Sequence, residues 1–513
     1  MKKIKTALIS VSEKNNLKFL LRNLNKYEIK IISSGGTFKK IKKLGFKSLE
    51  ISKYTGSPEI LEGRVKTLHP KIHAGILSKR NKKSHKKDLK KYNFREIDLV
   101  IVNFYPFENI LASSNNHNKI IENIDVGGPT LARAAAKNYN DVTVITNVNQ
   151  YDKLINELNK NKGSTTLKFR QKMSEEAFHE TGSYDSLIGN YFNKLSKNKF
   201  PKKKLVIGNL IHRLRYGENP HQEGGFYLTN KDFQLKQLNG KQLSYNNYND
   251  IFSALLISKS LPKNIGTVII KHSNPCGVST NKNKVKSYKL ALKCDPISAF
   301  GGVVSCNYKI NKKVANEIKN IFFEVVIGNG IDKDAIKILS KKKNLRIIDS
   351  NKFNFQNMES IVSNYNAMLI QSVDNKIFSK KDFKIVSKTR PDLKTLNNLI
   401  FAFNVCRFVK SNAIVIAKDF STIGIGSGQP SRIDSCKIAI NKMNKFQKIT
   451  NNDKIIAASD AFFPFVDGIE LLVQAGVTAI IQPSGSIKDK EIIKFANQTG
   501  TILVFSKTRH FRH

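Results

Sequence analysis

Strand-like and helix-like segments alternate along the first 150 residues, and this alternation limits the possible folds more than any other feature. The strand-like runs are rich in β-branched and other apolar side chains and cover residues 6–11, 28–32, 98–104 and 141–146. The helix-like segments carry apolar side chains at helical spacing and cover residues 13–25, 37–44 and 130–138. Such alternation predicts a parallel sheet whose strands are connected by helices.

The remainder of the chain, which has 513 residues in all and so room for two to four domains, divides into a helical stretch and a second α/β part. Residues 149–199 have no strand pattern, and the lysine-rich segment 195–204 is the best candidate for a linker. Further strands are expected at 267–271, 413–417, 456–458, 477–481 and 501–505. The segments 295–300 and 460–465 each begin with Asp and end with Phe, which suggests a faint internal repeat.

The charge balance first suggests a nucleic-acid partner, because 87 Lys and Arg face 40 Asp and Glu, a formal net charge of +47. However, the lysines are spread along the whole chain, and only 14 of the basic residues are Arg, the residue that reads bases best. Nucleic-acid binding on an α/β scaffold therefore stays a rival hypothesis rather than the leading one.

The cysteines and the hydropathy pattern indicate the cellular compartment and exclude several kinds of cysteine chemistry. The five cysteines are odd in number and widely spaced, so neither a disulfide framework nor a C-x-x-C zinc site is expected. The apolar stretch near the N-terminus is too short for a signal peptide, and no run approaches 18 apolar residues. We expect a cytoplasmic protein with no metal and no membrane association.

Two predicted strand-to-helix turns carry hydroxyl groups and glycines. They are Ser10-Val11-Ser12-Glu13-Lys14 and Ser33-Ser34-Gly35-Gly36-Thr37. Helix N-termini present free N–H groups, and glycine lets an anion approach the backbone. Each turn alone is equally explained by helix capping. Two such turns at successive strand ends favour an anion site at the carboxyl edge of the sheet.

Three more segments of the first part place polar groups near predicted helix starts or strand ends. They are Gly63-Arg64-Val65-Lys66-Thr67-Leu68-His69-Pro70-Lys71, Asn103-Phe104-Tyr105-Pro106 and Asp125-Val126-Gly127-Gly128-Pro129-Thr130. Thr130, Arg133 and Lys137 follow i, i+3, i+7 spacing, so they share one helix face. A solvated loop and an ordinary Asp cap would account for these segments equally well one by one.

Together these segments resemble the cyclohydrolase domain of the bifunctional AICAR transformylase/IMP cyclohydrolase family of purine biosynthesis. The resemblance implies a methylglyoxal-synthase-like parallel-sheet domain over residues 1–196. It implies that the nucleotide phosphate is held by Ser10, Ser12, Lys14, Ser34, Gly36 and Thr37. It implies that the closing ring is surrounded by Arg64, Lys66, Thr67, Asn103, Tyr105, Asp125, Gly127, Gly128 and Lys137.

The implied chemistry is loss of water as a carboxamide nitrogen attacks a formamide carbonyl. Amide nitrogen is a poor nucleophile, so the developing oxyanion needs cationic or hydrogen-bonding support. We expect Lys66 and Tyr105 to support the oxyanion, and Asp125 with Lys137 to deprotonate the nitrogen and return the proton.

In the second part, polar donors gather in Leu214 to Gln222, in Ser244 to Asn247 and in Lys271-His272-Ser273-Asn274-Pro275-Cys276-Gly277. Lys271 and His272 stand side by side at a predicted strand end and can supply an acid and a base near neutral pH. A surface histidine beside one of many lysines is the plainer alternative. A zinc deaminase is not expected, because His-x-Glu and Pro-Cys-x-x-Cys are missing.

Further segments extend the resemblance to nearly the whole chain. Asp295 to Gly302, Ser411-Asn412, Gly424 to Arg432, Ser459 to Asp467 and Arg509 to His513 resemble the transformylase domain in order and spacing. The resemblance implies a domain over residues 197–513 made of two cytidine-deaminase-like subdomains without metal, with active sites at a homodimer interface. Residues 310–405 carry few of the family's motifs.

The resemblance also implies roles for single residues of this second domain. His272 would be the general base on the 5-amino group of AICAR, Lys271 would assist the leaving group of the co-substrate 10-formyltetrahydrofolate, and Asn412 would position the formyl oxygen. The residues expected to bind nucleotide or folate are Arg215, Tyr216, Asn247, Gly301, Arg432, Phe462, Pro464, Asp467 and Arg509. A second rival hypothesis is that only one of the two domains is catalytically active.

Overall fold

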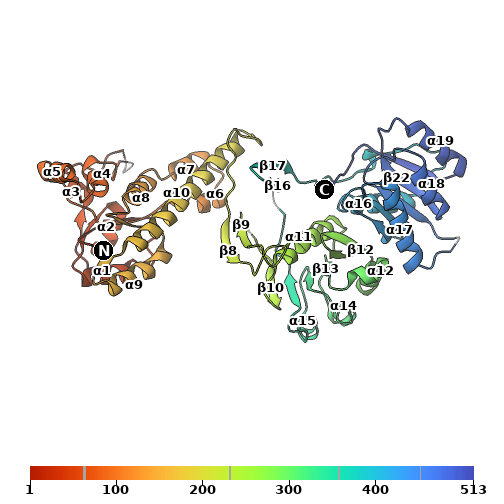
Figure 1. The fold of residues 1–513 in the computed structure, drawn as a ribbon, viewed down its shortest axis with the longest axis horizontal. Helices are drawn as coiled ribbons and strands as arrows, with labels where there is room; N and C mark the ends of the chain where they lie inside the picture. The colour runs from red at the N-terminus through yellow and green to blue at the C-terminus, as the bar shows by residue number, and fades with distance from the viewer. Residues whose placement is uncertain (62–64, 230–232, 356–358, 451) are drawn as a thin grey trace. The chain divides into compact units, whose positions relative to one another are not determined.

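In the computed structural model the chain separates into two units, Met1–Ile207 and Gly208–His513 (Figure 1). The structure describes residues 1–61, 65–229, 233–355, 359–450 and 452–513. Each unit is built on its own β-sheet, as the two alternating patterns in the sequence predict.

The first unit contains a five-stranded sheet in the order β4-β3-β2-β5-β6. All neighbouring pairs in it are parallel. The strands are β2 (Thr6–Val11), β3 (Lys30–Ser33), β4 (Leu49–Glu50), β5 (Leu99–Asn103) and β6 (Thr143–Ile145). The parallel sheet predicted from the sequence is therefore confirmed.

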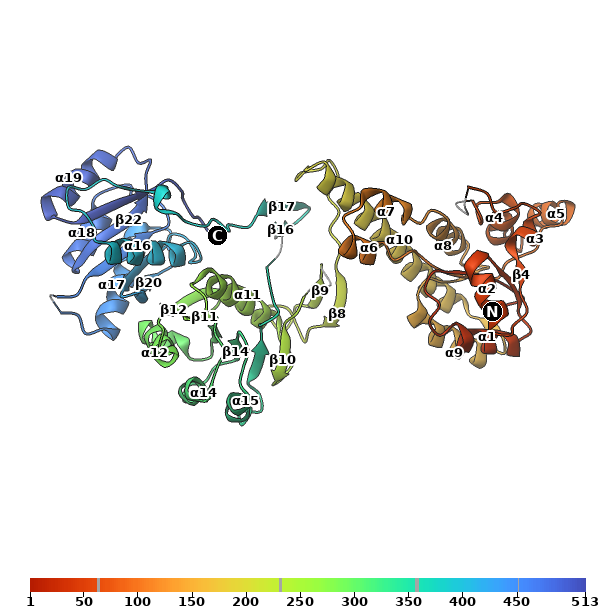
Figure 2. The same cartoon turned by 180° about the vertical axis from the view of Figure 1, so that it is seen from behind.

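Helices cover this sheet because a parallel sheet is apolar on both faces. They are α1 (Leu17–Lys26), α2 (Gly35–Lys43), α3 (Ile51–Thr55), α4 (Pro70–Leu77), α5 (Lys83–Lys91), α6 (Phe107–Ser113), α7 (His117–Glu122), α8 (Gly127–Lys137), α9 (Tyr151–Lys160) and α10 (Leu167–Leu195), with the short helix η2 (Val148–Gln150). The short strands β1 (Lys2–Lys3) and β7 (Ser164–Thr165) pair with each other. The 29-residue helix α10 packs along α8, as Figures 1 and 2 show.

The second unit contains one sheet of twelve strands, in the order β10-β15-β14-β13-β11-β12-β20-β19-β21-β22-β23-β18. The strands of its first half are β10 (Lys236–Asn239), β11 (Gly266–Lys271), β12 (Asn274–Thr280), β13 (Val303–Cys306), β14 (Val325–Gly328) and β15 (Arg346–Asp349). Those of its second half are β18 (Phe383–Ile385), β19 (Ile414–Lys418), β20 (Ser421–Gly426), β21 (Ile455–Ser459), β22 (Val477–Pro483) and β23 (Ile502–Ser506).

The two halves repeat one topology about the β12–β20 pair. In each half a hairpin is followed outward by three strands that pair in parallel and by an antiparallel edge strand. Both hairpins turn through two residues with positive φ, His272-Ser273 and Asp419-Phe420, which is typical of a type I′ turn. The internal repeat is therefore confirmed, and the hairpins at its centre define it.

The two Asp-to-Phe segments that suggested the repeat do not occupy equivalent positions. Residues 295–300 precede β13, whereas residues 460–465 follow β21, the equivalent strand. The two segments resemble each other because both are short polar segments next to strands. The evidence for the repeat is the order and direction of the strands.

Helices lie on both faces of this sheet. They are α11 (Tyr245–Ser260), α12 (Lys284–Cys294), α13 (Pro296–Ala299), α14 (Lys312–Ile318), α15 (Lys333–Leu339), α16 (Leu393–Cys406), α17 (Arg432–Phe446), α18 (Asp467–Gln474) and α19 (Asp489–Thr499), with the short helix η3 (Lys380–Asp382). Val268 and Ile270 pack in the core that contains α11 and α16 side chains, whereas Ile269 packs in the core that contains α12 side chains. The equivalent helices of the two halves therefore share a face.

Two further pairs of strands lie outside the two large sheets. They are β8 (Asn209–Arg213) with β9 (Gly225–Leu228), and β16 (Glu359–Asn364) with β17 (Ala367–Ser372). The β16–β17 hairpin exposes large apolar side chains, including a fully exposed Tyr365 and Leu369 at 62%. Among the described residues, no helix is long and apolar enough to cross a bilayer.

Candidate functional site

The carboxyl ends of β2 and β3 bring the two hydroxyl-rich turns of the first unit together. The Ser10 and Ser34 hydroxyl groups are hydrogen-bonded at 2.8 Å. The Thr37 hydroxyl group accepts from the Val11 amide at 3.0 Å and donates to the Val11 carbonyl at 3.1 Å. Since parallel strands present their carboxyl ends at one edge, this convergence is the arrangement that the sequence predicts.

The end of β5 joins the same edge through Asn103. Its side-chain oxygen accepts from the backbone amides of Ser12 at 2.6 Å and Glu13 at 2.9 Å, and its amide group donates to the Glu13 carbonyl at 3.0 Å. The Lys14 ammonium group donates to the Ser12 carbonyl at 3.0 Å. Asn103 thus fixes the first turn as well as bordering the site.

The start of α2 forms an open cationic corner at this edge. A Cβ on Gly36 would meet no atom within 4 Å, and a Cβ on Gly35 would lie 3.1 Å from the Lys66 ammonium nitrogen. Lys66 also forms an ion pair with Glu59 at 3.5 Å. A helix N-terminus with exposed glycine backbone and a nearby ammonium group suits a phosphate or another anion.

Asp125 lies at the start of α8, where backbone amides hold its carboxylate. One oxygen accepts from the Gly128 amide at 2.8 Å, and the other accepts from the Tyr105 amide at 3.3 Å. Burial raises the pKa of Asp125, although the amides of Gly128, Tyr105 and Gly127 act in the opposite direction. A buried carboxylate with a raised pKa near an ammonium group and a phenol is a candidate general base.

Three contacts complete this first cluster, and two of them involve residues that the sequence did not indicate. The Thr67 hydroxyl oxygen lies 2.8 Å from the position of a Cβ on Gly127, so it approaches the helix start closely. Tyr184, from α10, accepts from the Asp125 amide at 2.9 Å, and Glu59 neutralises Lys66. Arg64, which we expected beside Lys66, lies outside the described residues.

The structure does not bring Lys137 to this cluster. Lys137 is the last residue of α8, whereas Asp125 precedes its first residue, Gly127. A helix of that length extends about 15 Å, so the two side chains lie toward opposite ends of it. Pairing of Asp125 with Lys137 therefore has no geometric support within one chain, and the role of Lys137 stays a prediction.

In the second unit, six of the expected residues line one cavity of about 430 Å³ in the second half of the repeat. They are Asn412, Arg432, Phe462, Pro464, Asp467 and Arg509. The Arg509 guanidinium group lies 4.3 Å from the centre of the Phe511 ring, which also lines the cavity. A cationic group, aromatic rings and amides around one hollow suit an anionic aromatic ligand.

Arg432 holds the polar side of this cavity in place. Its guanidinium group, in a residue only 9% exposed, forms a close ion pair with the fully buried Asp460 and donates to the Ser459 hydroxyl at 2.7 Å. It also donates to the Asn412 side-chain oxygen at 2.8 Å. Arg432 therefore orients Asn412, in addition to its expected role as a nucleotide ligand.

Lys271 and His272 lie at the tip of the first-half hairpin. The Lys271 ammonium group donates to the Phe300 carbonyl at 2.8 Å, next to Gly301. His272 is exposed in the turn, and the turn is fixed because the Ser273 amide donates to Asp250 at 2.7 Å. The turn consists of His272 and Ser273 only, since Asn274 already begins β12.

Hydrogen bonds connect Asn247 to the segment that follows Gly301. Asn247 donates to Glu324 at 3.0 Å, and the Glu324 amide in turn donates to the Gly302 carbonyl at 2.9 Å. Arg215 and Tyr216 belong to a loop whose Glu218 carbonyl accepts from Asn246, at 3.2 Å. No contact of the described residues joins Arg215 or Tyr216 directly to Lys271 or His272, so their shared site stays a prediction. We call the expected first-half residues, Arg215, Tyr216, Asn247, Lys271, His272 and Gly301, the first-half cluster.

A hydrogen bond connects the two halves of the second unit close in sequence to both groups. The Lys410 amide donates to the Asn274 side chain at 3.0 Å, two residues before Asn412 and two after His272. The residues that line the 430 Å³ cavity nevertheless all come from the second half. Among the described residues, no group of three His, Cys, Asp or Glu side chains is placed to hold a metal ion.

Comparison with known proteins covers the whole chain. The profile of the AICARFT/IMPCHase bienzyme family matches residues 135–442, and that of the MGS-like domain matches residues 16–130. The bifunctional purine biosynthesis protein PurH of Bradyrhizobium diazoefficiens is 41% identical over 100% of this chain and 99% of its own length. PurH of Rhizobium johnstonii is 40% identical over 99% of this chain and 97% of its own. PurH of Agrobacterium fabrum is 40% identical over 100% of this chain and 97% of its own.

Proposed function

The chain belongs to the AICARFT/IMPCHase bienzyme family and is a bifunctional enzyme of purine biosynthesis, and from this premise we propose which unit and which residues carry each reaction. The unit Met1–Ile207 would close the formylated nucleotide to IMP, and the unit Gly208–His513 would transfer the formyl group to AICAR. The corresponding sequence domains are residues 1–196 and 197–513. A cytoplasmic location stays a prediction.

In the first unit, the nucleotide phosphate binds at the open start of α2. The glycine backbone of Gly36, the hydroxyl groups of Ser10 and Ser34, and the Lys14 side chain supply hydrogen-bond donors around it. Thr37 acts indirectly, because its hydroxyl group is already bonded to the Val11 backbone. The observation that supports this placement is the convergence of three strand ends on one uncovered helix start.

Ring closure then takes place between Lys66 and Asp125. The carboxamide nitrogen attacks the formyl carbon, a C–N bond forms, and the carbonyl oxygen becomes an oxyanion that is protonated to a hydroxyl group. The C–O bond then breaks and the formamide nitrogen loses its proton, so that water leaves and the ring C=N bond forms. Asp125, whose pKa burial raises, accepts a proton from the nitrogen. Lys66 stabilises the oxyanion, with Tyr105 as a second donor.

In the second unit, the 5-amino group of AICAR attacks the formyl carbon of a formyl folate, which we take to be 10-formyltetrahydrofolate. A bond forms to the amino nitrogen, the bond from the formyl carbon to the folate nitrogen breaks, and His272 accepts the proton of the amine. Lys271 donates a proton to the leaving nitrogen, and Asn412 orients the formyl oxygen. The aminoimidazole nitrogen is a weak nucleophile, so positioning carries much of the acceleration.

We also propose that the active enzyme is a homodimer. The cavity around Asn412 has no wall from the first-half cluster, so a second copy can complete it. The β16–β17 hairpin supports the same idea, because an isolated two-stranded hairpin with exposed apolar side chains is poorly stable without a covering surface. Light scattering coupled to gel filtration measures the mass in solution, and a purely monomeric active enzyme would overturn the proposal.

The single observation that carries the proposed division of labour is the presence of two separately built sites, one in each unit. The experiment is to assay ring closure and formyl transfer separately on single-site variants of the full chain. We expect changes at Lys66 to affect only ring closure and changes at His272 to affect only formyl transfer. Loss of both activities from either change would refute separate sites.

A further inference from the structure

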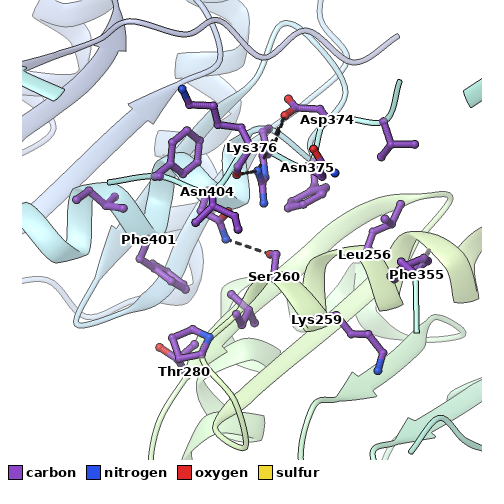
Figure 3. Close-up of a pocket in the computed structure, with 18 of the residues that line it drawn as sticks. Leu256, Lys259, Ser260, Thr280, Phe355, Asp374, Asn375, Lys376, Phe401 and Asn404 are labelled. Atoms are coloured by element: carbon purple, nitrogen blue, oxygen red, sulfur yellow. Dashed lines mark hydrogen bonds and ion pairs between the residues drawn. The ribbon is translucent and has the colours of Figure 1, made fainter. Parts of the chain in front are cut away.

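A cavity of about 810 Å³ in the second unit belongs to neither reaction site. It lies between α11 and α16, the equivalent helices of the two halves, and the segment 373–378 closes one side. Figure 3 shows Leu256 and Ser260 on α11, with Phe401 and Asn404 on α16. We call it the interhelix cavity; none of the reaction-site residues lines it.

The cavity exists because the two helices on this face are held apart. On the other face α12 and α17 pack directly on each other. Between α11 and α16, by contrast, a hydrogen bond from the Asn404 amide group to the Ser260 hydroxyl, at 3.1 Å, bridges the gap (Figure 3). Between the two helices the cavity reaches Thr280, the last residue of β12, and Phe420, in the turn between β19 and β20.

The lining combines aromatic rings with side-chain amides. Phe355, Phe401 and Phe420 contribute rings, and Asn397 and Asn404 contribute donors and acceptors. Aromatic faces suit a flat ring, and amides that present both donor and acceptor groups suit the polar edge of a heterocycle. The volume lies within the range of cavities that bind small molecules.

Three cationic side chains, Lys259, Lys376 and Arg407, and one carboxylate, Asp374, line the cavity. Arg407 lies 4.0 Å from Asp374, and Lys376 pairs with Asp382 at 2.9 Å, so Lys259 supplies the charge that remains available to a ligand. Lys259 is an exposed residue, and its ammonium group lies 6.0 Å from the centre of the Phe353 ring. Partial burial of this group lowers the pKa of Lys259. Arg407 is 8% exposed, and its Nε atom is buried without a hydrogen-bond partner. An anionic group in the cavity would be attracted by the cationic side chains of Lys259 and Arg407, both of which line it.

The wall formed by residues 373–378 is anchored to the body of the unit. Asp374 accepts from His510 at 2.5 Å, and the Lys376 carbonyl accepts from Arg407 at 2.5 Å. Figure 3 shows Asp374, Asn375 and Lys376 along this side of the cavity. The cavity thus has fixed walls on three sides, as a binding site requires.

We propose that the interhelix cavity is a third ligand site, which takes a flat aromatic ring that carries an anionic group. The nucleotides of the reaction sequence and the folate have this chemistry, and the purine mononucleotide product and the folate carry the larger fused rings. Binding of either would let the enzyme respond to its own product or co-substrate at a place separate from both reactions.

The test uses the fact that the chain has no tryptophan. Asn397, exposed on α16, is changed to Trp in the full-length protein, and 5-fluorotryptophan is incorporated so that one ¹⁹F NMR signal reports on the cavity. IMP and folic acid are titrated separately. Lys259→Gln is added to remove the charge, and Lys263→Gln is the matched control, since Lys263 is exposed but does not line the cavity.

We expect a saturable shift of the ¹⁹F signal with at least one of the two probes, and that probe identifies the source. Lys259→Gln should weaken this binding by at least about tenfold, as expected for a charge-assisted contact, whereas Lys263→Gln should not. Circular dichroism verifies folding of each variant. Three results would overturn the proposal. The ¹⁹F signal does not shift at millimolar concentrations of either probe, the affinity measured from the shift is the same in the Lys259→Gln variant, or the shift changes only with protein concentration.

Discussion

The Lys66→Ala substitution separates catalysis from stability in the first unit. Lys66 pairs with Glu59 at 3.5 Å, and the two side chains are 29% and 33% exposed. A pair with this much solvent contact contributes at most about 1 kcal/mol to folding. Loss of a group that stabilises a developing oxyanion, by contrast, raises the barrier by about 3–4 kcal/mol, a rate decrease of about 10²–10³.

The assay follows conversion of the formylated nucleotide to IMP by ultraviolet absorbance, with formyl transfer measured in parallel. Lys71→Ala is the matched control, because Lys71 is close in sequence but its ammonium group lies over the Tyr54 ring, at 4.9 Å. We expect a large decrease in kcat for ring closure, no change in formyl transfer and little change in Tm. Ring closure within about twofold of the unaltered enzyme, ~0.4 kcal/mol, would refute the role of Lys66.

Four further predictions follow from the two sites. His272→Ala should abolish formyl transfer and leave ring closure intact in separate assays; a variant that still transfers formyl groups would exclude His272 as the base. Because burial raises the pKa of Asp125, its ionised form is lost on acidification at a higher pH than for a free Asp, so ring closure should fall through that pKa, and Asp125→Asn should remove this limb of the pH–rate profile. Arg432→Met should cost about 3–5 kcal/mol in denaturant unfolding by leaving Asp460 buried and unpaired, and adding Asp460→Leu should restore part of that loss. Leu369→Asp on the exposed hairpin should shift the mass measured by light scattering toward the monomer, and an unchanged dimer would exclude this surface from the interface.

The sequence indicates a structural element best where apolar periodicity is strong. Residues 6–11 were expected as a strand and form β2, because their side chains are almost all buried. In α5, by contrast, Leu89 is the only buried residue among many lysines, so no periodic signal exists to predict a helix.

β12 was missed for a different reason. Pro275 and Gly277 read as turn residues, yet both lie within the strand. The register shifts between Ile269 and Ile270 opposite them, and a Cβ on Gly277 would lie 1.9 Å from the Ala291 carbonyl of α12. The glycine is needed for helix packing, a tertiary requirement that local sequence does not reveal.

The same distinction between local and distant signals applies to the sites. Ser10, Ser34 and Asn103 were predictable as neighbours, because each lies at or just beyond the carboxyl end of a strand of one parallel sheet. Tyr184 supports Asp125 from a helix 59 residues away in sequence, and no motif connects the two. The interhelix cavity depends on the distance between α11 and α16. That distance follows from how the two halves of the unit pack together, so the local sequence does not reveal it.

The most direct test of the account is a single incubation of the purified full-length chain with AICAR and 10-formyltetrahydrofolate, analysed by mass spectrometry for the formylated nucleotide and for IMP. We predict that the unaltered protein produces IMP, that Lys66→Ala accumulates the formylated nucleotide, and that His272→Ala produces neither while still converting added formylated nucleotide to IMP. A folded protein that yields neither product from AICAR, or a Lys66→Ala variant that yields IMP at the unaltered rate, would contradict the account.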